Sequence, residues 1–419
     1  MGENGLHRAR QRTRRPVAGV VAATSVALLL IAGGTAFGVG ADEPSAPSTQ
    51  AAEPPSATIV PNGDSAGGSS RAQLHLPAPT AERFTIAFTG DVLVHQSVWE
   101  AAAAAATDGR RFDFRPLLAP VRSIIAGADL AICHLETPLS PDDSDLSSYP
   151  VFNVPHEVAP ALKWAGFDGC STASNHSLDQ GTDGIDATLD ALDRAGLEHA
   201  GTVRTRAEAA RITAYDVGGV TVAHLSYSFG FNGYSREHEW QANLIEPERI
   251  VADARRARAD GAALVVVSLH CCVEYQHLPT GYQQEVAHSL AASHQVDLIV
   301  GHHAHVVQPI ARVGRMWVAY GLGNFLSSMT SSLGTAAVED GVILLADVER
   351  RGEGYAVADL RYVPTWVEYG AWRVVPVQRA LAGRVRNSAS AATLRASLQR
   401  TRDAIDLLGA DDLGVRSVA

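Results

Sequence analysis

Lysine is almost absent from this chain of 419 residues, because Lys163 is the only lysine among its 34 basic residues. Nothing around Lys163 indicates a catalytic role. Charged residues make up 19% of the chain and apolar residues 46%. This composition excludes a disordered chain, a coiled coil and a transporter with many membrane spans. The net charge of −11 argues against nucleic acid as a partner, since broad phosphate binding needs a basic surface.

Cysteine is scarce as well, with Cys133, Cys170, Cys271 and Cys272 as its only representatives. Four cysteines in a chain of this size do not make a disulfide scaffold. Cys271 and Cys272 are neighbours, and a bridge between them would strain the backbone. We therefore expect this pair to be two small, buried thiols.

Charge is missing altogether from residues 16–41, and five arginines lie within the first 15 residues. An uncharged run of this length can cross a bilayer as a helix. The sequence predicts a basic cytoplasmic tail over 1–15 and a transmembrane anchor or cleaved signal peptide over 16–41. Residues 42–82, rich in Pro, Ser and Ala, then form a linker. We expect a single-pass membrane protein with its C-terminal domain outside the cytoplasm, or a secreted one if the segment is cleaved.

Behind the linker, apolar β-branched runs alternate with alanine-rich helical stretches. We expect strands over 84–88, 128–133, 166–171, 221–227, 262–269, 296–300 and 317–320. We expect helices over 97–106, 158–165, 184–195, 247–261 and 283–294. Such alternation predicts an α/β fold with helices covering the sheet.

Polar side chains follow five of the expected strands where each strand ends. They are Asp91, Glu136, Asn175 with His176, His270, and His303 with His305. Ligand sites of α/β folds lie beyond the carboxyl ends of the strands, so we expect these side chains to converge. Each alone is a common turn residue, but together they predict a shared metal site.

The residue types in this set suit one or two divalent ions of Mn, Fe or Zn, because carboxylate, amide and imidazole groups bind these metals without a thiolate. A two-metal centre needs a bridging carboxylate with several histidine and oxygen ligands. We expect Asp91, Glu136, Asn175, His270, His303 and His305 to be the ligands. His176 is then free to act as a general acid or a phosphate clamp.

The same segments resemble the calcineurin-like metallophosphatase superfamily and, within it, the CapA family of capsule and poly-γ-glutamate synthesis proteins. The matching segments are 89–92, 135–139, 152–155, 173–181, His270 with 274–275, 301–309 and 320–325. The resemblance implies a four-layer α/β/β/α sandwich over residues 83–370 with the metal site at the strand ends. It also implies a membrane-anchored protein outside the cytoplasm. Residues 371–419 form a C-terminal extension, with an amphipathic helix over 389–408.

Three functions are compatible with this resemblance. The first is a metal-dependent hydrolase, acting on phosphoester or amide bonds, in the synthesis or export of an anionic polymer. The second is a non-catalytic partner that binds the polymer or its synthesis complex. The third is a phosphoesterase for another substrate, which follows from analogy with the superfamily alone.

Departures from the family pattern add candidates to the site. The superfamily begins with Asp-x-His, whereas the next histidine after Asp91 here is His95, which becomes a candidate ligand. Of the three histidines in 302–305 we favour His303 and His305, because alternate residues of an extended segment face the same way. His302 is then a further candidate for a ligand or a supporting role. Glu274 and Asn324 are further candidates for a ligand or a supporting role. Cys133–His134 and Cys271–Cys272 replace the usual family residues and are expected to change the walls of the site.

Overall fold

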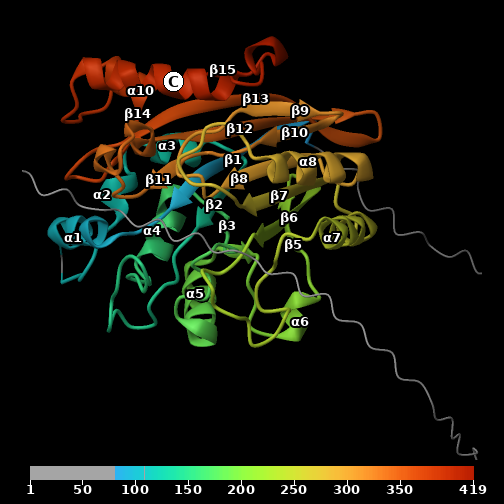
Figure 1. The fold of residues 1–419 in the computed structure, drawn as a ribbon, viewed down its shortest axis with the longest axis horizontal. Coiled ribbons are helices and arrows are strands. Elements are labelled where there is room, and N and C mark those ends of the chain that lie inside the picture. The colour runs from blue at the N-terminus through green and yellow to red at the C-terminus, as the bar shows by residue number, and fades with distance from the viewer. Residues whose placement is uncertain (1–80, 108) are drawn as a thin grey trace, which may run out of the picture. The chain divides into compact units, whose positions relative to one another are not determined.

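The structure is a computed structural model that describes residues 81–107 and 109–419 (Figure 1). The predicted basic tail, the anchor or signal segment and nearly all of the linker lie outside these residues. Within the described part of the chain, no helix combines the length and the apolar character that crossing a membrane requires.

The larger of two sheets has nine strands and contains the first strand of the domain, β1, near its middle. Its order is β14 (Val374–Pro376), β13 (Gly354–Val367), β12 (Asp340–Arg351), β1 (Arg83–Val92), β2 (Leu130–Leu135), β3 (Gly169–Ser171) and β4 (Glu198–Ala200). In addition, β11 (Asn324–Leu326) pairs with β1 and β15 (Arg416–Ser417) pairs with β13. Strands β1 to β4 are parallel, so their carboxyl ends share one edge.

The smaller sheet has six strands in the order β5 (Thr213–Val217), β6 (Val220–Ser228), β7 (Leu264–His270), β8 (Leu298–His302), β10 (Met316–Ala319) and β9 (Ile310–Val313). The four inner strands are parallel, and the two edge strands are antiparallel to their neighbours. The inner strands β7 and β8 are buried along their whole length, as expected for parallel strands covered on both faces.

The two sheets face each other across an apolar core. Phe88 and Ile132 of the larger sheet meet Val266 and Trp317 of the smaller sheet in this layer. The indole nitrogen of Trp317 donates to the carbonyl of Val357 on β13, which ties the sheets together (3.0 Å).

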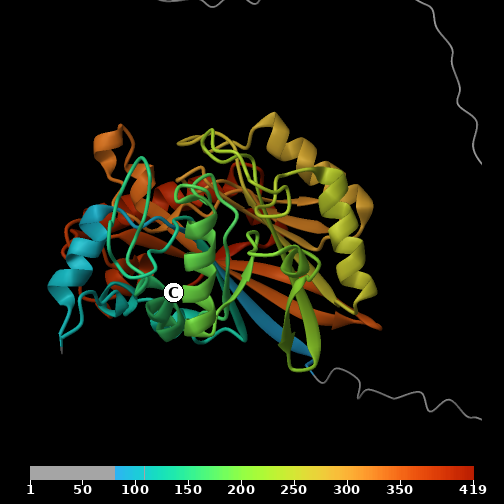
Figure 2. The same ribbon diagram turned by 90° about the horizontal axis from the view of Figure 1, so that it is seen from below.

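Helices cover the outer face of each sheet (Figures 1 and 2). The outer face of the larger sheet packs against α1 (Gln96–Ala105), α2 (Arg115–Leu118), α3 (Arg122–Ile125), α4 (Val158–Ala165) and α5 (Gly181–Ala195). The outer face of the smaller sheet packs against α7 (Pro247–Ala259) and α8 (Gly281–Ser293). One further short helix, α6 (Arg206–Ala209), precedes β5. The predicted α/β fold is confirmed, with its layers in the order helix, sheet, sheet, helix.

The C-terminal helices lie on the antiparallel part of the larger sheet. They are α9 (Val377–Leu381) and α10 (Ala391–Asp406), and α10 occupies most of the helical stretch expected over 389–408. Ile405 of α10 belongs to the same apolar cluster as Leu360 and Tyr362 of β13. Arg400 of α10 forms an ion pair with Asp340 of β12 (2.7 Å). The helix therefore covers strands that the smaller sheet leaves open.

Candidate metal centre

The predicted ligating side chains come together where the parallel strands of both sheets end. Asp91 lies at the end of β1, Glu136 follows β2, and Asn175 and His176 lie in the turn after β3. From the smaller sheet, His270 ends β7, His302 ends β8, and His303 and His305 follow it. All of these side chains are buried.

One group of three side chains forms around Asp91. The Asp91 Oδ1 atom lies 3.3 Å from His302 Nδ1. The ring of His134 stacks on that of His302, with centroids 4.0 Å apart. One ligand atom from each of these residues lies within 4.8 Å of the other two, which is close enough for a common ion.

A second group consists of Glu136, His303 and His305, whose ligand atoms also lie within 4.8 Å of one another. His305 connects the two groups, because its Nδ1 atom is 3.0 Å from Asp91 Oδ2 and its Nε2 atom is 3.8 Å from Glu136 Oε1. Asp91 thus faces a histidine of each group, His302 through Oδ1 and His305 through Oδ2, which is the position that a bridging carboxylate of a two-metal centre would take.

His270 and Asn175 border the second group. His270 Nε2 lies 2.8 Å from Asn175 Oδ1 and 3.9 Å from Glu136 Oε1. The other ring nitrogen of His270 lies 2.9 Å from His134 Nε2. The side-chain contacts from His134 through His270 to Asn175 therefore connect the two sheets.

Several buried polar atoms in the centre have no hydrogen-bond partner. They are Asp91 Oδ1, both carboxyl oxygens of Glu136, and the Nδ1 atoms of His302 and His303. Leaving such atoms unpartnered costs stability, so buried polar groups almost always find a partner. Divalent cations bind these atom types, and the residues present therefore fit one or two such ions.

The charge states in the centre also fit a cation. Burial raises the pKa of Glu136 well above its usual value, so this group needs a nearby positive charge to be a carboxylate. Burial lowers the pKa of His303 to about 3, which keeps that imidazole neutral with a lone pair available. Burial also disfavours the charged form of His305, but Glu136 and Asp91 outweigh this and raise its pKa to about 9.

His176 is held by a neighbouring carboxylate. Its Nδ1 atom lies 2.7 Å from Asp179 Oδ2, and the Asp179 side chain is completely buried. The same Asp179 oxygen accepts the backbone N–H of Phe152 (2.8 Å), whose ring packs edge-on against His176. This pairing fixes the imidazole and directs Nε2, the second ring nitrogen, away from Asp179.

A family model described as bacterial capsule synthesis protein PGA_cap matches residues 85–329. The chain belongs to this PGA_cap family. The capsule biosynthesis protein CapA of Bacillus anthracis is 28% identical over 309 residues, which cover 72% of this chain and 71% of that protein. The PGA biosynthesis protein CapA of Bacillus subtilis (strain 168) is 28% identical over 201 residues, or 47% of this chain and 51% of that one.

Among solved structures, the calcineurin-like phosphoesterase YfkN from Bacillus subtilis aligns with a TM-score of 0.42 and 15% sequence identity. The alignment covers 77% of this chain and 97% of that chain.

The remaining candidates of this PGA_cap chain take supporting positions. Asn324 accepts from His305 Nδ1 (3.1 Å) and donates to the carbonyl of Val338 (2.8 Å), so it orients that histidine. His95 lies against the carbonyl of Leu93 (3.1 Å) and belongs to neither group of ligand atoms among the described residues. Glu274 is exposed and acts on the centre through its charge, which raises the pKa of Glu136 and His305.

His302 and His134 are closer to the centre than the sequence indicated. Sequence reasoning left His302 open between a ligand and a supporting role and gave His134 a place in the wall, and both offer an atom to the Asp91 group. His134 and Glu136 are two residues apart at the end of a strand, which places them on one face. From the sequence, this spacing could have indicated that His134 faces the centre together with Glu136.

The three histidines converge for a different reason from the one that their spacing indicated. His303 and His305 have φ values of 82° and 53°, so the segment after β8 is a tight turn rather than an extended strand. Non-glycine residues in this region cluster at functional sites, where the surroundings hold them in place. Gly301 is required beside them, since a Cβ there would collide with the carbonyl of Tyr320.

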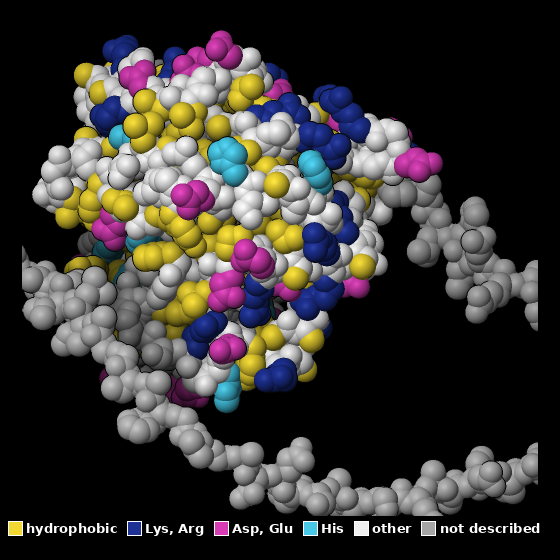
Figure 3. Space-filling view, turned by 45° about the vertical axis from the view of Figure 1, so that its right-hand side comes forward, with side chains coloured by type: hydrophobic (Ala, Val, Ile, Leu, Met, Phe, Trp, Pro, Cys, Tyr) yellow, Lys and Arg dark blue, Asp and Glu magenta, His cyan; other side chains and the backbone are white. Residues whose placement is uncertain are grey.

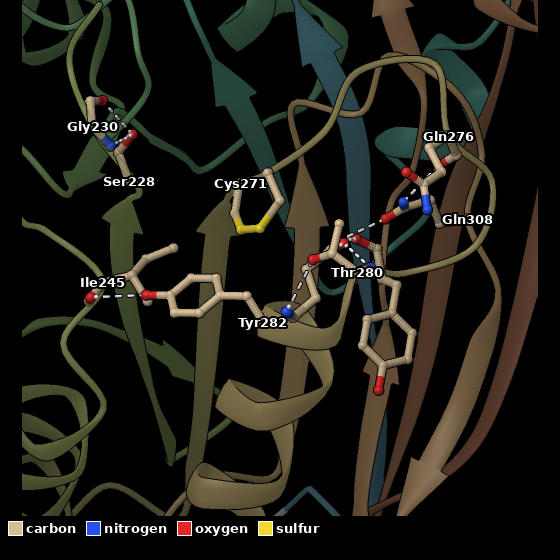
Figure 4. Close-up of a disulfide and its surroundings, with 11 residues drawn as sticks. Ser228, Gly230, Ile245, Cys271, Gln276, Thr280, Tyr282 and Gln308 are labelled. Atoms are coloured by element: carbon tan, nitrogen blue, oxygen red, sulfur yellow. Dashed lines mark hydrogen bonds between the residues drawn. A yellow bond between two sulfur atoms is a disulfide. The ribbon is translucent and has the colours of Figure 1, made fainter. Parts of the chain in front are cut away.

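The expectation of two free thiols at Cys271 and Cys272 is wrong. The structure joins them in a disulfide directly after His270 (Figure 4). It also joins Cys133 to Cys170. Cys272 has a φ of 145°, because the chain turns sharply where β7 ends. Cys133 and Cys170 are register partners on the neighbouring strands β2 and β3, so their side chains point to the same face.

Proposed function

We propose that this protein is a metal-dependent hydrolase in the synthesis or export of an anionic capsule polymer of the poly-γ-glutamate type. The buried cluster of Asp91, Glu136 and histidines with unpartnered ligand atoms carries this proposal. The names of the relatives, which refer to capsule and PGA biosynthesis, support a role in capsule polymer synthesis. The carboxylate, amide and imidazole groups of the cluster support metal-dependent hydrolysis.

The first group (Asp91, His134 and His302) and the second group (Glu136, His303 and His305) would each hold one divalent ion of Mn, Fe or Zn. Asn175 and His270 would complete the second position. When bound, such ions supply Lewis acidity and offset the charge of the two carboxylates.

His176 is proposed as the general acid. Asp179 keeps the proton on Nδ1, so a proton held on Nε2 can pass to the leaving oxygen of a phosphoester or the leaving nitrogen of an amide. Asn175 and Asn232 lie beside this pair, linked by a hydrogen bond of 3.2 Å, and can bind polar substrate atoms. Phe229 packs on His303 with ring centroids 4.7 Å apart and shields the metal ligands from water.

We further propose that residues 16–41 anchor the protein in the cell membrane with the domain outside, as the preceding arginines favour. If the segment is cleaved as a signal peptide, the protein is secreted. Full-length chain in the cytosol after cell fractionation would contradict both arrangements.

A non-catalytic, polymer-binding role is the second candidate function. Four arginines favour it, because they line one hollow that includes none of the candidate metal ligands. They are Arg373, Arg379, Arg384 and Arg386.

The hydrolase proposal is tested on the purified protein by elemental analysis, followed by a screen of phosphoester and γ-glutamyl substrates with and without added metal. Bound Mn, Fe or Zn together with metal-dependent hydrolysis is the expected result. Absence of bound metal and of any affinity on titration would overturn the enzymatic assignment.

A further inference from the structure

An arginine hollow lies between the C-terminal segment and α3, outside the metal centre. We use this name for the cavity of about 620 Å³ lined by Arg373, Arg379, Arg384 and Arg386. Its opposite wall includes Ser123 of α3. Four guanidinium groups therefore line one cavity of a chain whose net charge is −11.

The backbone directs two of these arginines into the hollow. Val385 packs inward against the apolar cluster that contains Trp366 and Leu394. Val385 lies in a bend of the chain, and its neighbours on both sides remain at the surface. Arg384 and Arg386 are accordingly both exposed and both line the hollow.

The arginines differ in how far their charge is already used. Arg373 pairs with buried Glu368 at 2.7 Å. Arg379 donates to Ser123 Oγ at 2.7 Å and to a terminal oxygen of Ala419 at 3.5 Å, so part of its charge is already used. Within the residues that the structure describes, neither Arg384 nor Arg386 has an ion-pair partner. The charges of Arg384 and Arg386 are therefore available to a ligand.

Other arginine-bearing hollows of the molecule carry their own counter-charges. One of about 500 Å³ contains Arg312 and Arg315 together with Asp297. Another of about 470 Å³ contains Arg204 beside Glu208, with which it forms an ion pair of 2.9 Å. Arginines and carboxylates also lie side by side on the face that brings α7 and α8 forward (Figure 3). By contrast, no Asp or Glu side chain is among the described residues that line the arginine hollow.

We propose that the arginine hollow binds a chain of repeated carboxylates, such as a γ-linked glutamate oligomer. The proposal rests on the proposed function, which supplies an anionic polymer as the molecule to be bound. Guanidinium groups pair with carboxylates through two parallel hydrogen bonds, which makes arginine well suited to such a ligand. Several arginines around one concavity can bind successive carboxylates of one chain, whereas a single anion uses only one or two of them.

A flexible chain fits the recess better than a bilayer surface does. A planar layer of lipid headgroups contacts side chains on a convex surface, whereas these arginines line a shallow, open hollow. The hollow would also hold a polymer on a protein whose overall charge repels it, since the local potential decides contacts within a Debye length of about 8–10 Å.

The test measures binding of γ-linked decaglutamate to the full-length protein at low salt with a chelator present, so that the metal centre does not contribute. We expect Arg384→Gln/Arg386→Gln to weaken binding about tenfold, since each exposed ion pair contributes only modestly. The matched control is Arg194→Gln/Arg255→Gln, which removes two exposed arginines of α5 and α7 and is expected to bind like the wild type. Free glutamate at equal carboxylate concentration is expected to bind weakly to all variants.

Unchanged binding by Arg384→Gln/Arg386→Gln, or equal weakening by the control pair, would overturn the proposal. Binding of anionic lipid vesicles without binding of decaglutamate would also overturn it and assign the hollow to a membrane surface. Metal content and hydrolysis are measured on the same samples. Decaglutamate binding that depends on Arg384 and Arg386 in a protein without metal or hydrolysis would reject the hydrolase and retain the arginine hollow.

Discussion

The two sheets contribute different atoms to the same centre. The larger sheet supplies the candidate oxygen ligands, Asp91 from β1 and Glu136 after β2, with Asn175 in the next turn. The smaller sheet supplies nitrogen from His270 and from the histidines after β8, and only His134 departs from this division. A divalent ion of the Mn, Fe or Zn type binds both atom kinds, so neither sheet alone makes a complete site. The centre therefore depends on how the two sheets are packed together as well as on which side chains each sheet supplies.

Removing one ligand from either sheet gives the largest expected effect. Glu136→Gln in the larger sheet and His270→Ala in the smaller one are each expected to weaken metal binding more than about 100-fold. Even residues that only support a ligand change affinity by 10- to 100-fold, so a ligand itself contributes more. Elemental analysis after dialysis against trace metal measures the effect.

The control for these variants is His199→Ala, which removes a histidine of β4 that bonds Asp193 (3.2 Å) and belongs to neither group. It is expected to retain metal. Loss of metal from only one of the two ligand variants would show that one sheet holds the ions by itself.

The next largest expected effect is on turnover, and it separates catalysis from metal binding in the larger sheet. His176→Ala is expected to retain metal and to lower turnover by about 10²–10⁴-fold, the usual contribution of a positioned acid. The measurement is kcat on a substrate found in the hydrolysis screen. A matched control is His156→Ala, because His156 also pairs with a carboxylate, Asp143, at 2.7 Å, outside the proposed centre. Full activity of His176→Ala with metal bound would remove His176 from the mechanism.

A smaller loss is expected when the partner of His176 is changed. Asp179→Asn keeps the shape of the side chain but removes the charge that orients the imidazole. We expect turnover to fall about 10- to 100-fold with KM nearly unchanged, as for other residues that position a catalytic group. Asp143→Asn is the matched control and is expected to keep full turnover. An equal loss in both variants would indicate a general effect on folding.

The smallest expected effect is on the pH dependence of stability. It involves one largely buried carboxyl group in or next to a strand of each sheet. Burial raises the pKa of Asp340, at the start of β12, to about 6, although it pairs with Arg400. A carboxyl whose folded pKa is raised adds stability below its unfolded pKa of about 4, and this is lost as pH rises towards 6. The free energy of unfolding is thus expected to fall by about 1–3 kcal/mol across this interval.

Asp340→Asn is expected to remove that part of the pH dependence in urea unfolding curves. Burial also raises the pKa of Asp297 in the smaller sheet, which pairs with Arg258, so Asp297→Asn is expected to act in the same direction. A slope unchanged in both variants would exclude these two groups as its cause.

Local sequence patterns were sufficient to predict the strands and helices that surround the centre. The inner parallel strands were predictable because they are buried on both faces and read as continuous apolar runs, as in Leu264–His270. The long antiparallel strands β12 and β13 were not assigned from sequence. Their place in the sheet depends on remote partners, because the pairing of β12 with β1 joins segments more than 250 residues apart.

By itself, the sequence determined which strand ends carry ligating atoms, because strand period and polar strand-end residues are local properties. The tertiary structure decided which of the two groups His134 joins, that Cys133 meets Cys170, and that His302 lies as close as its neighbours. These contacts depend on strand register and on a turn with positive φ, which no local pattern encodes. The arginine hollow also needed the fold, because its arginines face α3 only after the C-terminal segment has packed on the larger sheet.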